Sequence, residues 1–233
     1  MEIKMTIKNI IVTGASRGIG FELVKYFSEQ NHRVLALTRN RKKMDQLQKA
    51  DNISVLEVDI TKEKDLMVVV NYITKQWKKV DIVIHNAGLL INKPFYKTTA
   101  ADFLNVYKVN VFAVVELSKK VLPFLQEGSH VVAISSIGGI QGSVKFAGLS
   151  AYSSSKGALI TLMELLAEEY KASGISFNTL ALGAVQTEML EQAFPDFKAP
   201  VSAVEMATYI ANFALTGNRV YNGKILQVSN STP

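Results

Sequence analysis

The sequence has no cysteine and only three histidines among its 233 residues. The missing cysteine excludes a disulfide framework, a zinc–thiolate site, an iron–sulfur cluster and a cysteine nucleophile. His32, His85 and His130 lie far apart and lack the spacing of metal ligands, so we expect no metal site. No uncharged apolar stretch reaches the roughly 18 residues of a membrane span, and residues 1–9 lack the apolar core of a secretory signal. We therefore expect a cytoplasmic protein with no membrane partner.

The remaining composition is that of an ordinary folded chain, with 48% hydrophobic and 20% charged residues. The length suits one large α/β domain, which we predict over residues 1–233. The net charge of +6 fits either a solvated basic surface or an anionic partner. Most lysines are scattered between apolar positions, so nucleic acid is not expected as a partner. The densest basic run covers residues 39–43.

Short apolar runs alternate with longer amphipathic segments along the chain. Strands are predicted at residues 9–13, 34–38, 53–58, 81–85, 130–135, 175–182 and 224–228. Helices are predicted at residues 18–30, 42–50, 62–78 (with Thr61 as its N-cap), 102–126, 151–172 and 203–215. This alternation is typical of β-α-β units, and continuous apolar strands fit a sheet covered on both faces. We predict an α/β fold with a doubly wound parallel sheet of about seven strands. Two long loops, residues 137–150 and 186–202, should lie over its carboxyl edge, where ligands bind.

A glycine-rich segment directly follows the first predicted strand. It reads Thr-Gly-Ala-Ser-Arg-Gly-Ile-Gly over residues 13–20 and leads straight into a helix. Glycines permit a tight turn and a close approach of the backbone to a pyrophosphate, while the helix N-terminus favours negative charge. The alternative is a purely structural turn, since many such turns need a positive φ. Its place after the first strand favours dinucleotide binding, as in a Rossmann-type fold.

The end of the second predicted strand bears on which dinucleotide is bound. NAD sites usually carry an acidic residue there for the ribose 2′-hydroxyl, but this strand ends at the uncharged Thr38, followed by Arg39. Arg17 lies in the glycine turn itself. Two guanidinium groups near the adenosine ribose suit a 2′-phosphate. We therefore expect NADP(H) in preference to NAD(H), although residues 39–43 could also be a solvated helix entry.

Tyr152 and Lys156 lie four residues apart in a predicted helix and so share one face. The spacing alone is common by chance, but the pair follows a strand that ends in Ser135-Ser136 and should lie at the ligand edge. Reduction of a ketone needs a proton for the new alkoxide, which a phenol can supply. A nearby ammonium can lower the phenol pKa by the required amount, and Ser136 could hold the carbonyl oxygen. The alternative is a surface tyrosine over a solvated lysine.

Taken in order, these motifs resemble the classical short-chain dehydrogenase/reductase family over nearly the whole chain. The glycine turn resembles the cofactor turn of the family, Asn86-Ala87-Gly88 resembles the motif that closes its fourth strand, and Tyr152 and Lys156 match its YxxxK pair. The departures from the family include His85 in place of an asparagine and Leu182-Gly183 in place of Pro-Gly. We expect His85 to be a packing or backbone-bonding group.

The resemblance implies roles for individual residues. Tyr152 would be the general acid or base, Lys156 would bind the nicotinamide ribose and lower the tyrosine pKa, Ser136 would orient the substrate and Asn110 would hold a water in a proton relay. The expected catalytic residues are Asn110, Ser136, Tyr152 and Lys156. The expected cofactor-binding residues are Gly14, Ser16, Arg17, Gly18, Ile19, Gly20, Thr38, Arg39, Asp59, Ile60, Asn86, Ala87, Gly88, Tyr152, Lys156, Val185 and Thr187.

The resemblance also implies a homodimer or homotetramer, with the helices that begin near Asp102 and Ala151 at the main interface. A small or medium carbonyl or alcohol substrate is expected. Candidate pocket walls are Leu90, Ile91, Phe95, Val144, Phe146, Met189, Leu190, Phe194 and Phe197. Two alternatives stay open: a 3-oxoacyl-carrier-protein reductase, and a protein that binds NADPH as a sensor without catalysis.

Overall fold

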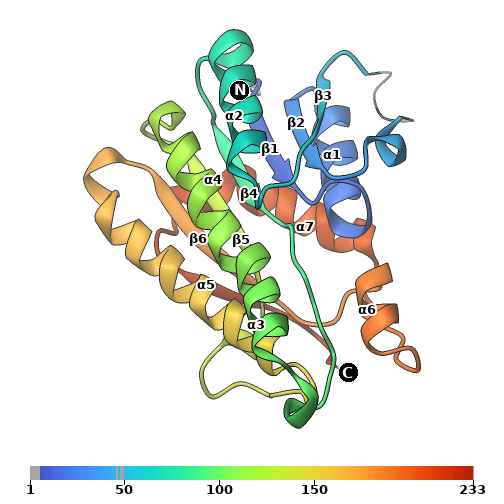
Figure 1. Cartoon of the computed structure of the whole chain (residues 1–233). Coiled ribbons are helices and arrows are strands. Elements are labelled where there is room, and N and C mark those ends of the chain that lie inside the picture. Colours follow the sequence, from blue (N-terminus) through green and yellow to red (C-terminus); the bar gives the residue numbers. More distant parts are fainter. Residues whose placement is uncertain (1–5, 46, 48–49, 233) are drawn as a thin grey trace.

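The computed structural model describes residues 6–45, 47 and 50–232 (Figure 1). Its centre is one parallel sheet in the order β3-β2-β1-β4-β5-β6-β7, which confirms the predicted doubly wound fold with seven strands. The strands are β1 (Asn9–Thr13), β2 (Arg33–Thr38), β3 (Ile53–Glu57), β4 (Ile82–His85), β5 (His130–Ser136), β6 (Ser176–Leu182) and β7 (Ile225–Val228). The strand order reverses between β1 and β4, and this reversal leaves a crevice at the carboxyl ends of the strands.

Helices connect the strands and cover both faces of the sheet (Figure 1). They are α1 (Gly18–Glu29), α2 (Glu63–Tyr72), α3 (Ala100–Tyr107), α4 (Ala113–Val121), α5 (Ser150–Glu169), α6 (Glu188–Ala193) and α7 (Ala203–Thr216). Two π-helical turns, Ile73–Trp77 after α2 and Lys108–Phe112 between α3 and α4, keep the predicted helices 62–78 and 102–126 continuous over most of their length. Across residues 6–45, 47 and 50–232, no helix has the length and apolar character needed to cross a membrane.

Three local expectations need correction. The helix predicted at 42–50 is a short 3₁₀ helix, Arg41–Met44, and residues 46, 48 and 49 lie outside the described part of the chain. Thr61 does not cap α2; its hydroxyl donates to Asp59 Oδ1 at 2.8 Å, and Lys62 precedes the helix without a side-chain cap. The loop 186–202 contains α6, because the Thr187 hydroxyl accepts a hydrogen bond from the Leu190 N–H and so starts a helical turn.

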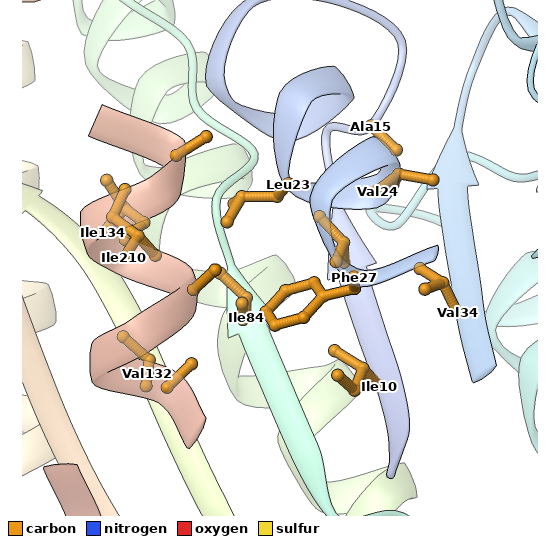
Figure 2. Packing of buried hydrophobic residues seen from close by; sticks show 14 of the residues in the cluster. Ile10, Ala15, Leu23, Val24, Phe27, Val34, Ile84, Val132, Ile134 and Ile210 are labelled. Atoms are coloured by element: carbon orange, nitrogen blue, oxygen red, sulfur yellow. The ribbon is translucent and has the colours of Figure 1, made fainter. Parts of the chain in front are cut away.

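Two apolar clusters fill the spaces on either side of the sheet. On one side, α1 and α7 pack against each other and against the strands. Figure 2 shows Phe27 of α1 lying over β1 and β4, near Ile10 and Ile84, with Ile210 of α7 close to Ile134. On the other side, α2, α4 and α5 cover the sheet. Burial of one such side chain contributes about 1.5–3 kcal/mol, so the two clusters fix the strands whose carboxyl ends form the crevice.

Candidate active site

The glycine turn between β1 and α1 leaves no room for side chains at two of its glycines. Gly14 has a φ of +68°, and a Cβ there would lie 2.8 Å from Ala87 Cα. A Cβ at Gly20 would lie 2.2 Å from the Gly14 carbonyl oxygen and 2.6 Å from Asn86 Nδ2. The turn therefore packs directly on the segment after β4, and its exposed backbone forms one wall of the crevice.

Thr13 and Asn86 hold the ends of β1 and β4 together. The buried Thr13 hydroxyl accepts hydrogen bonds from the N–H groups of Asn86 (3.0 Å) and Ala87 (2.9 Å). In return, Asn86 Nδ2 donates to the carbonyl oxygens of Thr13 (3.0 Å) and Gly14 (3.3 Å). This reciprocal bonding explains why an asparagine follows β4, and it fixes the backbone of both segments at the crevice.

A cavity of about 430 Å³ opens at this edge of the sheet. It collects residues from the ends of β1, β2, β3, β4, β5 and β6 and from α5 and α6. Of all the predicted site residues, Gly20 and Asn110 are absent from its lining; the rest face the cavity. They are Gly14, Ser16, Arg17, Gly18, Ile19, Thr38, Arg39, Asp59, Ile60, Asn86, Ala87, Gly88, Ser136, Tyr152, Lys156, Val185 and Thr187.

One end of the cavity carries most of its charge. Arg17, Arg39 and Lys43 line it beside Thr38, whose hydroxyl accepts a hydrogen bond from the Asn40 N–H at 3.0 Å. Glu188, at the start of α6, lies among these cations: its Oε2 is 2.7 Å from Arg17 Nη1 and 3.9 Å from Lys43 Nζ. The hydrogen bond from Arg17 lowers the pKa of the Glu188 carboxyl, which is therefore ionised at neutral pH.

Asp59 follows β3 at the same end of the cavity. Partial burial raises the pKa of its carboxyl, but two hydrogen bonds from Thr61 and the charges of Lys62 and Arg39 outweigh burial, so the pKa lies below its usual value. Asp59 is thus an ionised acceptor, and Oδ1 is engaged by the Thr61 N–H and hydroxyl.

Ser136, Tyr152 and Lys156 meet farther along the cavity, where β5 and α5 lie side by side. Burial raises the pKa of the Tyr152 phenol to about 12, and the hydrogen bond with Ser136 lowers it in part. Lys156 Nζ lies 5.7 Å from the centre of the tyrosine ring, and the expectation that Lys156 lowers this pKa stays a prediction. At neutral pH the phenol is therefore protonated and can donate a proton.

Lys156 is held in one position by β5. Its ammonium donates to the Ile134 carbonyl oxygen at 2.7 Å, and its backbone carbonyl accepts from the Ser135 hydroxyl at 2.9 Å. Only 3% of the residue is exposed, and burial lowers the pKa of the Lys156 ammonium to about 8. A cation is therefore fixed at the middle of the cavity, next to Gly88 and the tyrosine ring.

Asn110 lies in the π-helical turn between α3 and α4 and is fully buried. Its Oδ1 accepts from the Leu89 N–H at 2.8 Å, and its Nδ2 donates to the Leu89 carbonyl (3.0 Å) and the Ser155 hydroxyl (2.9 Å). Its side chain is thus occupied with the segment after β4 and with α5. This geometry makes Asn110 a residue that positions the cavity walls.

The other end of the cavity is apolar. Among the expected pocket walls, five line it: Leu90, Phe146, Met189, Leu190 and Phe194. The remaining four (Ile91, Phe95, Val144 and Phe197) are not part of its lining, and Phe95 and Val144 are 72% and 60% exposed. The loops curve so that these two side chains point to solvent.

Three residues that shape the site were not predicted from the sequence. Glu188 was a single acidic residue in an expected loop, and nothing in its neighbours indicated a contact with Arg17, 171 residues earlier. Asn92 links the segment after β4 to the end of α6: its Nδ2 donates to the Ala193 carbonyl at 2.7 Å, and the adjacent Lys93 N–H donates to the Gly148 carbonyl. Thr232 reaches the cavity because the Ser231 carbonyl accepts from the Ala184 N–H at 3.1 Å.

His85, where the sequence departs from the expected asparagine, is buried beneath the site. Its Nε2 lies 3.0 Å from the Ser118 hydroxyl, and burial lowers the pKa of its imidazole to about 4. The expected packing role is confirmed, but its polar partner is a side chain of α4 and not the backbone.

Comparison with known proteins agrees with this geometry. The sequence profile of the short chain dehydrogenase family matches residues 8–198. The chain is 30% identical over 193 residues to an uncharacterized oxidoreductase, YxjF, of Bacillus subtilis (80% of this chain, 74% of the relative). It is also 30% identical over 192 residues to 2-(R)-hydroxypropyl-CoM dehydrogenase of Xanthobacter autotrophicus (78% and 76%).

Its fold is similar to the solved structure of a short chain dehydrogenase from Burkholderia cenocepacia in complex with NADP. The TM-score is 0.85 at 24% identity, and the match covers 96% of this chain and 97% of the other. The family profile, which spans most of the chain, and the relatives at 30% identity show that this protein is an oxidoreductase of the short-chain dehydrogenase family, which acts on CH–OH and C=O groups.

Proposed function

We propose that the chain is an NADP(H)-dependent oxidoreductase that interconverts a small or medium uncharged carbonyl compound and its alcohol, with Tyr152 as general acid and base. The observation that carries this proposal is one continuous cavity. Ser136, Tyr152 and Lys156 lie between a basic end, which suits a phosphorylated adenosine, and an apolar end that suits a substrate.

The residues at the basic end fit the dinucleotide. The turn at Gly14 and Gly18 brings backbone without side chains to the crevice, and Arg17, Arg39 and Lys43 line the cavity near the end of β2. Thr38, the last residue of β2, offers no carboxylate for a ribose 2′-hydroxyl. Arginine side chains are good partners for a phosphate, and this set therefore supports NADP(H) over NAD(H).

NADPH, when bound, supplies the hydride for the carbonyl carbon. Ser136 would hold the carbonyl oxygen, and the protonated Tyr152 phenol would give its proton to that oxygen as negative charge develops there. The fixed Lys156 ammonium would stabilise the resulting phenolate. In the direction of alcohol oxidation, the same phenolate would take the hydroxyl proton. General acid catalysis of this kind contributes about 10²–10⁴ in rate.

The substrate end supports an uncharged substrate. Leu90, Phe146, Leu149, Met189 and Phe194 line it. The charged lining residues other than Lys156 come from the glycine turn, the segments that follow β2 and β3, and the start of α6. A charged group at this end would lose its hydration without gaining an opposite charge. Aliphatic and aromatic aldehydes and ketones are therefore the substrates to test first.

The first experiment measures oxidation of NADPH, and separately of NADH, with a panel of aldehydes, ketones, diketones, quinones and 3-oxoacyl thioesters. Turnover of neutral carbonyl compounds with NADPH, at least tenfold faster than with NADH, is the expected result. Turnover confined to the acyl thioesters would favour a 3-oxoacyl-carrier-protein reductase. Tight NADPH binding without any turnover would favour a sensor, and equal rates with both cofactors would contradict the proposed preference.

The role of Tyr152 is tested by Tyr152→Phe. This change removes one hydroxyl from the cavity and keeps the ring. Turnover should fall by about 10²–10⁴, while the Kd for NADPH, followed by cofactor fluorescence, should change less than about threefold. Retained turnover in this variant would show that another group donates the proton.

A homodimer or homotetramer is the assembly we propose. Leu104, Phe112 and Leu165, on the α3–α4 run and α5, are 66%, 54% and 63% exposed. Apolar side chains of this size on neighbouring helices are typical of surfaces that a partner covers. Light scattering of the purified chain should therefore give a mass of two or four chains; a monomer at micromolar concentration would contradict the proposal.

A further inference from the structure

Outside the proposed catalytic group, an ion pair joins the glycine turn to α6. Glu188 Oε2 accepts from Arg17 Nη1 at 2.7 Å and lies 3.9 Å from Lys43 Nζ. Arg17, Lys43 and Glu188 all line the basic end of the cavity. The carboxylate therefore occupies the place between two cations that an exogenous anion would otherwise take.

The pair is accessible to a competing ligand. The side chains of Arg17, Lys43 and Glu188 are 41%, 48% and 50% exposed. An ion pair of this exposure is weak and is screened by salt. A phosphate monoester carries up to about two negative charges and three acceptor oxygens, so it can displace a single carboxylate from Arg17.

We propose that Glu188 is a selectivity residue that opposes binding of the 2′-phosphate of NADP(H), because it pairs with Arg17 and adds a negative charge at the basic end of the cavity. This inference rests on the proposed cofactor site but not on the proposed preference. Arg17 and Arg39 would set the attraction for the phosphate, and Glu188 would limit it, so NADP(H) binds less tightly than the basic residues alone would allow.

Glu188 lies at the start of α6. Thr187 caps this short helix, and Met189, Leu190 and Phe194 line the apolar end of the cavity. The ion pair thus spans from the cofactor turn to the segment that covers the substrate end. Weak pairing lets an incoming phosphate take Arg17 while the apolar contacts of α6 stay in place.

The test is Glu188→Gln, which keeps the size of the side chain and removes its charge. Calorimetry would measure the Kd of adenosine 2′,5′-bisphosphate and of 5′-AMP, two probes that differ in the 2′-phosphate and need no turnover. The bisphosphate should bind about fivefold more tightly to the variant, the factor that corresponds to about 1 kcal/mol for an exposed pair. Binding of 5′-AMP should change less than twofold.

Two further variants make the result specific. Glu191→Gln removes the same charge one turn later on α6, where the carboxylate accepts from Gln186 Nε2 at 2.7 Å, and it should leave both Kd values unchanged. In an Arg17→Gln background, Glu188→Gln should tighten bisphosphate binding much less, because Arg17, the partner of the carboxylate, is absent.

The outcomes separate this inference from the proposed cofactor preference. A bisphosphate Kd that is unchanged in Glu188→Gln, or equally changed in Glu191→Gln, would overturn the role of Glu188 while leaving the preference intact. Equal affinity of the unmodified chain for NADPH and NADH would instead contradict the preference, and the role of Glu188 would still be judged on the bisphosphate. Failure of all these ligands to bind would overturn both.

Discussion

Buried polar side chains decide where the walls of the cavity lie. Asn110 and Lys156 are 0% and 3% exposed, and each is satisfied by backbone groups of a neighbouring segment. A buried polar group that loses its partner costs about 1–3 kcal/mol. These side chains therefore fix the segments after β4 and along β5 more firmly than apolar contacts alone would.

Asn110→Ala tests this positioning role. The change removes the acceptor of the Leu89 N–H and the donor to the Leu89 carbonyl and the Ser155 hydroxyl. We expect the free energy of unfolding in urea to fall by about 2–4 kcal/mol, because buried backbone groups lose their partners. Asn105→Ala is the control: Asn105 is exposed on α3, and the loss should stay within about 0.5 kcal/mol. Equal losses in the two variants would contradict the prediction.

At the scale of the helices, strands and loops, close packing against α5 fixes the position of the loop after β5. A Cβ at Gly139 would lie 2.8 Å from the Gly157 nitrogen and from the carbonyl carbon of Lys156, both of them backbone atoms. The loop can therefore reach Lys156 only with glycine at position 139. The position of Ser136 and Gly138 relative to Tyr152 depends on this close packing.

Gly139→Ala should displace the loop from α5. We expect a loss of stability of about 1–3 kcal/mol from overpacking and a fall in kcat of roughly 10- to 100-fold from misplacement of the reacting groups. Gly142→Ala is the control in the same loop: its φ of +74° brings backbone strain, but a Cβ there meets nothing within 4 Å. It should cost about 1 kcal/mol and leave kcat nearly unchanged. A similar fall in kcat in both variants would argue against the contact.

For the whole molecule, the buried histidines link stability to pH. Burial lowers the pKa of His85 and His130 to about 4 each, from an ordinary value of 6.5. Between these values the unfolded chain binds a proton that the folded chain does not, so stability falls as the pH drops from 6.5 to about 4. Each histidine accounts for on the order of 3 kcal/mol of this loss.

His85→Asn should flatten this dependence. The variant removes one of the buried histidines and keeps a polar side chain opposite Ser118. Urea unfolding between pH 7 and 4 should show that the variant loses on the order of 3 kcal/mol less stability than the unmodified chain over this interval. The stability at pH 7 serves as the reference for each protein. Parallel curves would mean that His85 takes up its proton at the same pH in the folded and unfolded chains, so that burial does not lower its pKa.

The fold could be predicted from the sequence because the periodicity of strands and helices is a local property. All seven strands lie within a residue or so of the predicted ranges, since each is a continuous apolar run bounded by polar or glycine residues. The start of the helix predicted at 42–50 is a 3₁₀ helix, Arg41–Met44, because apolar spacing does not distinguish an α-helix from a 3₁₀ turn. The helix α6 was missed because a single Thr187 cap starts it inside an irregular segment.

Most of the predicted site residues line one cavity, because most of them lie at or just after the carboxyl ends of strands, and parallel strands end at the same edge. Short sequence motifs were enough to predict the glycine turn, the basic residues after β2 and the Tyr152/Lys156 pair. Tertiary packing decided the rest. It turned Asn110 toward Leu89, paired Arg17 with Glu188 across 171 residues, and raised the Tyr152 pKa, because burial and long-range contacts depend on the whole fold and leave no local pattern.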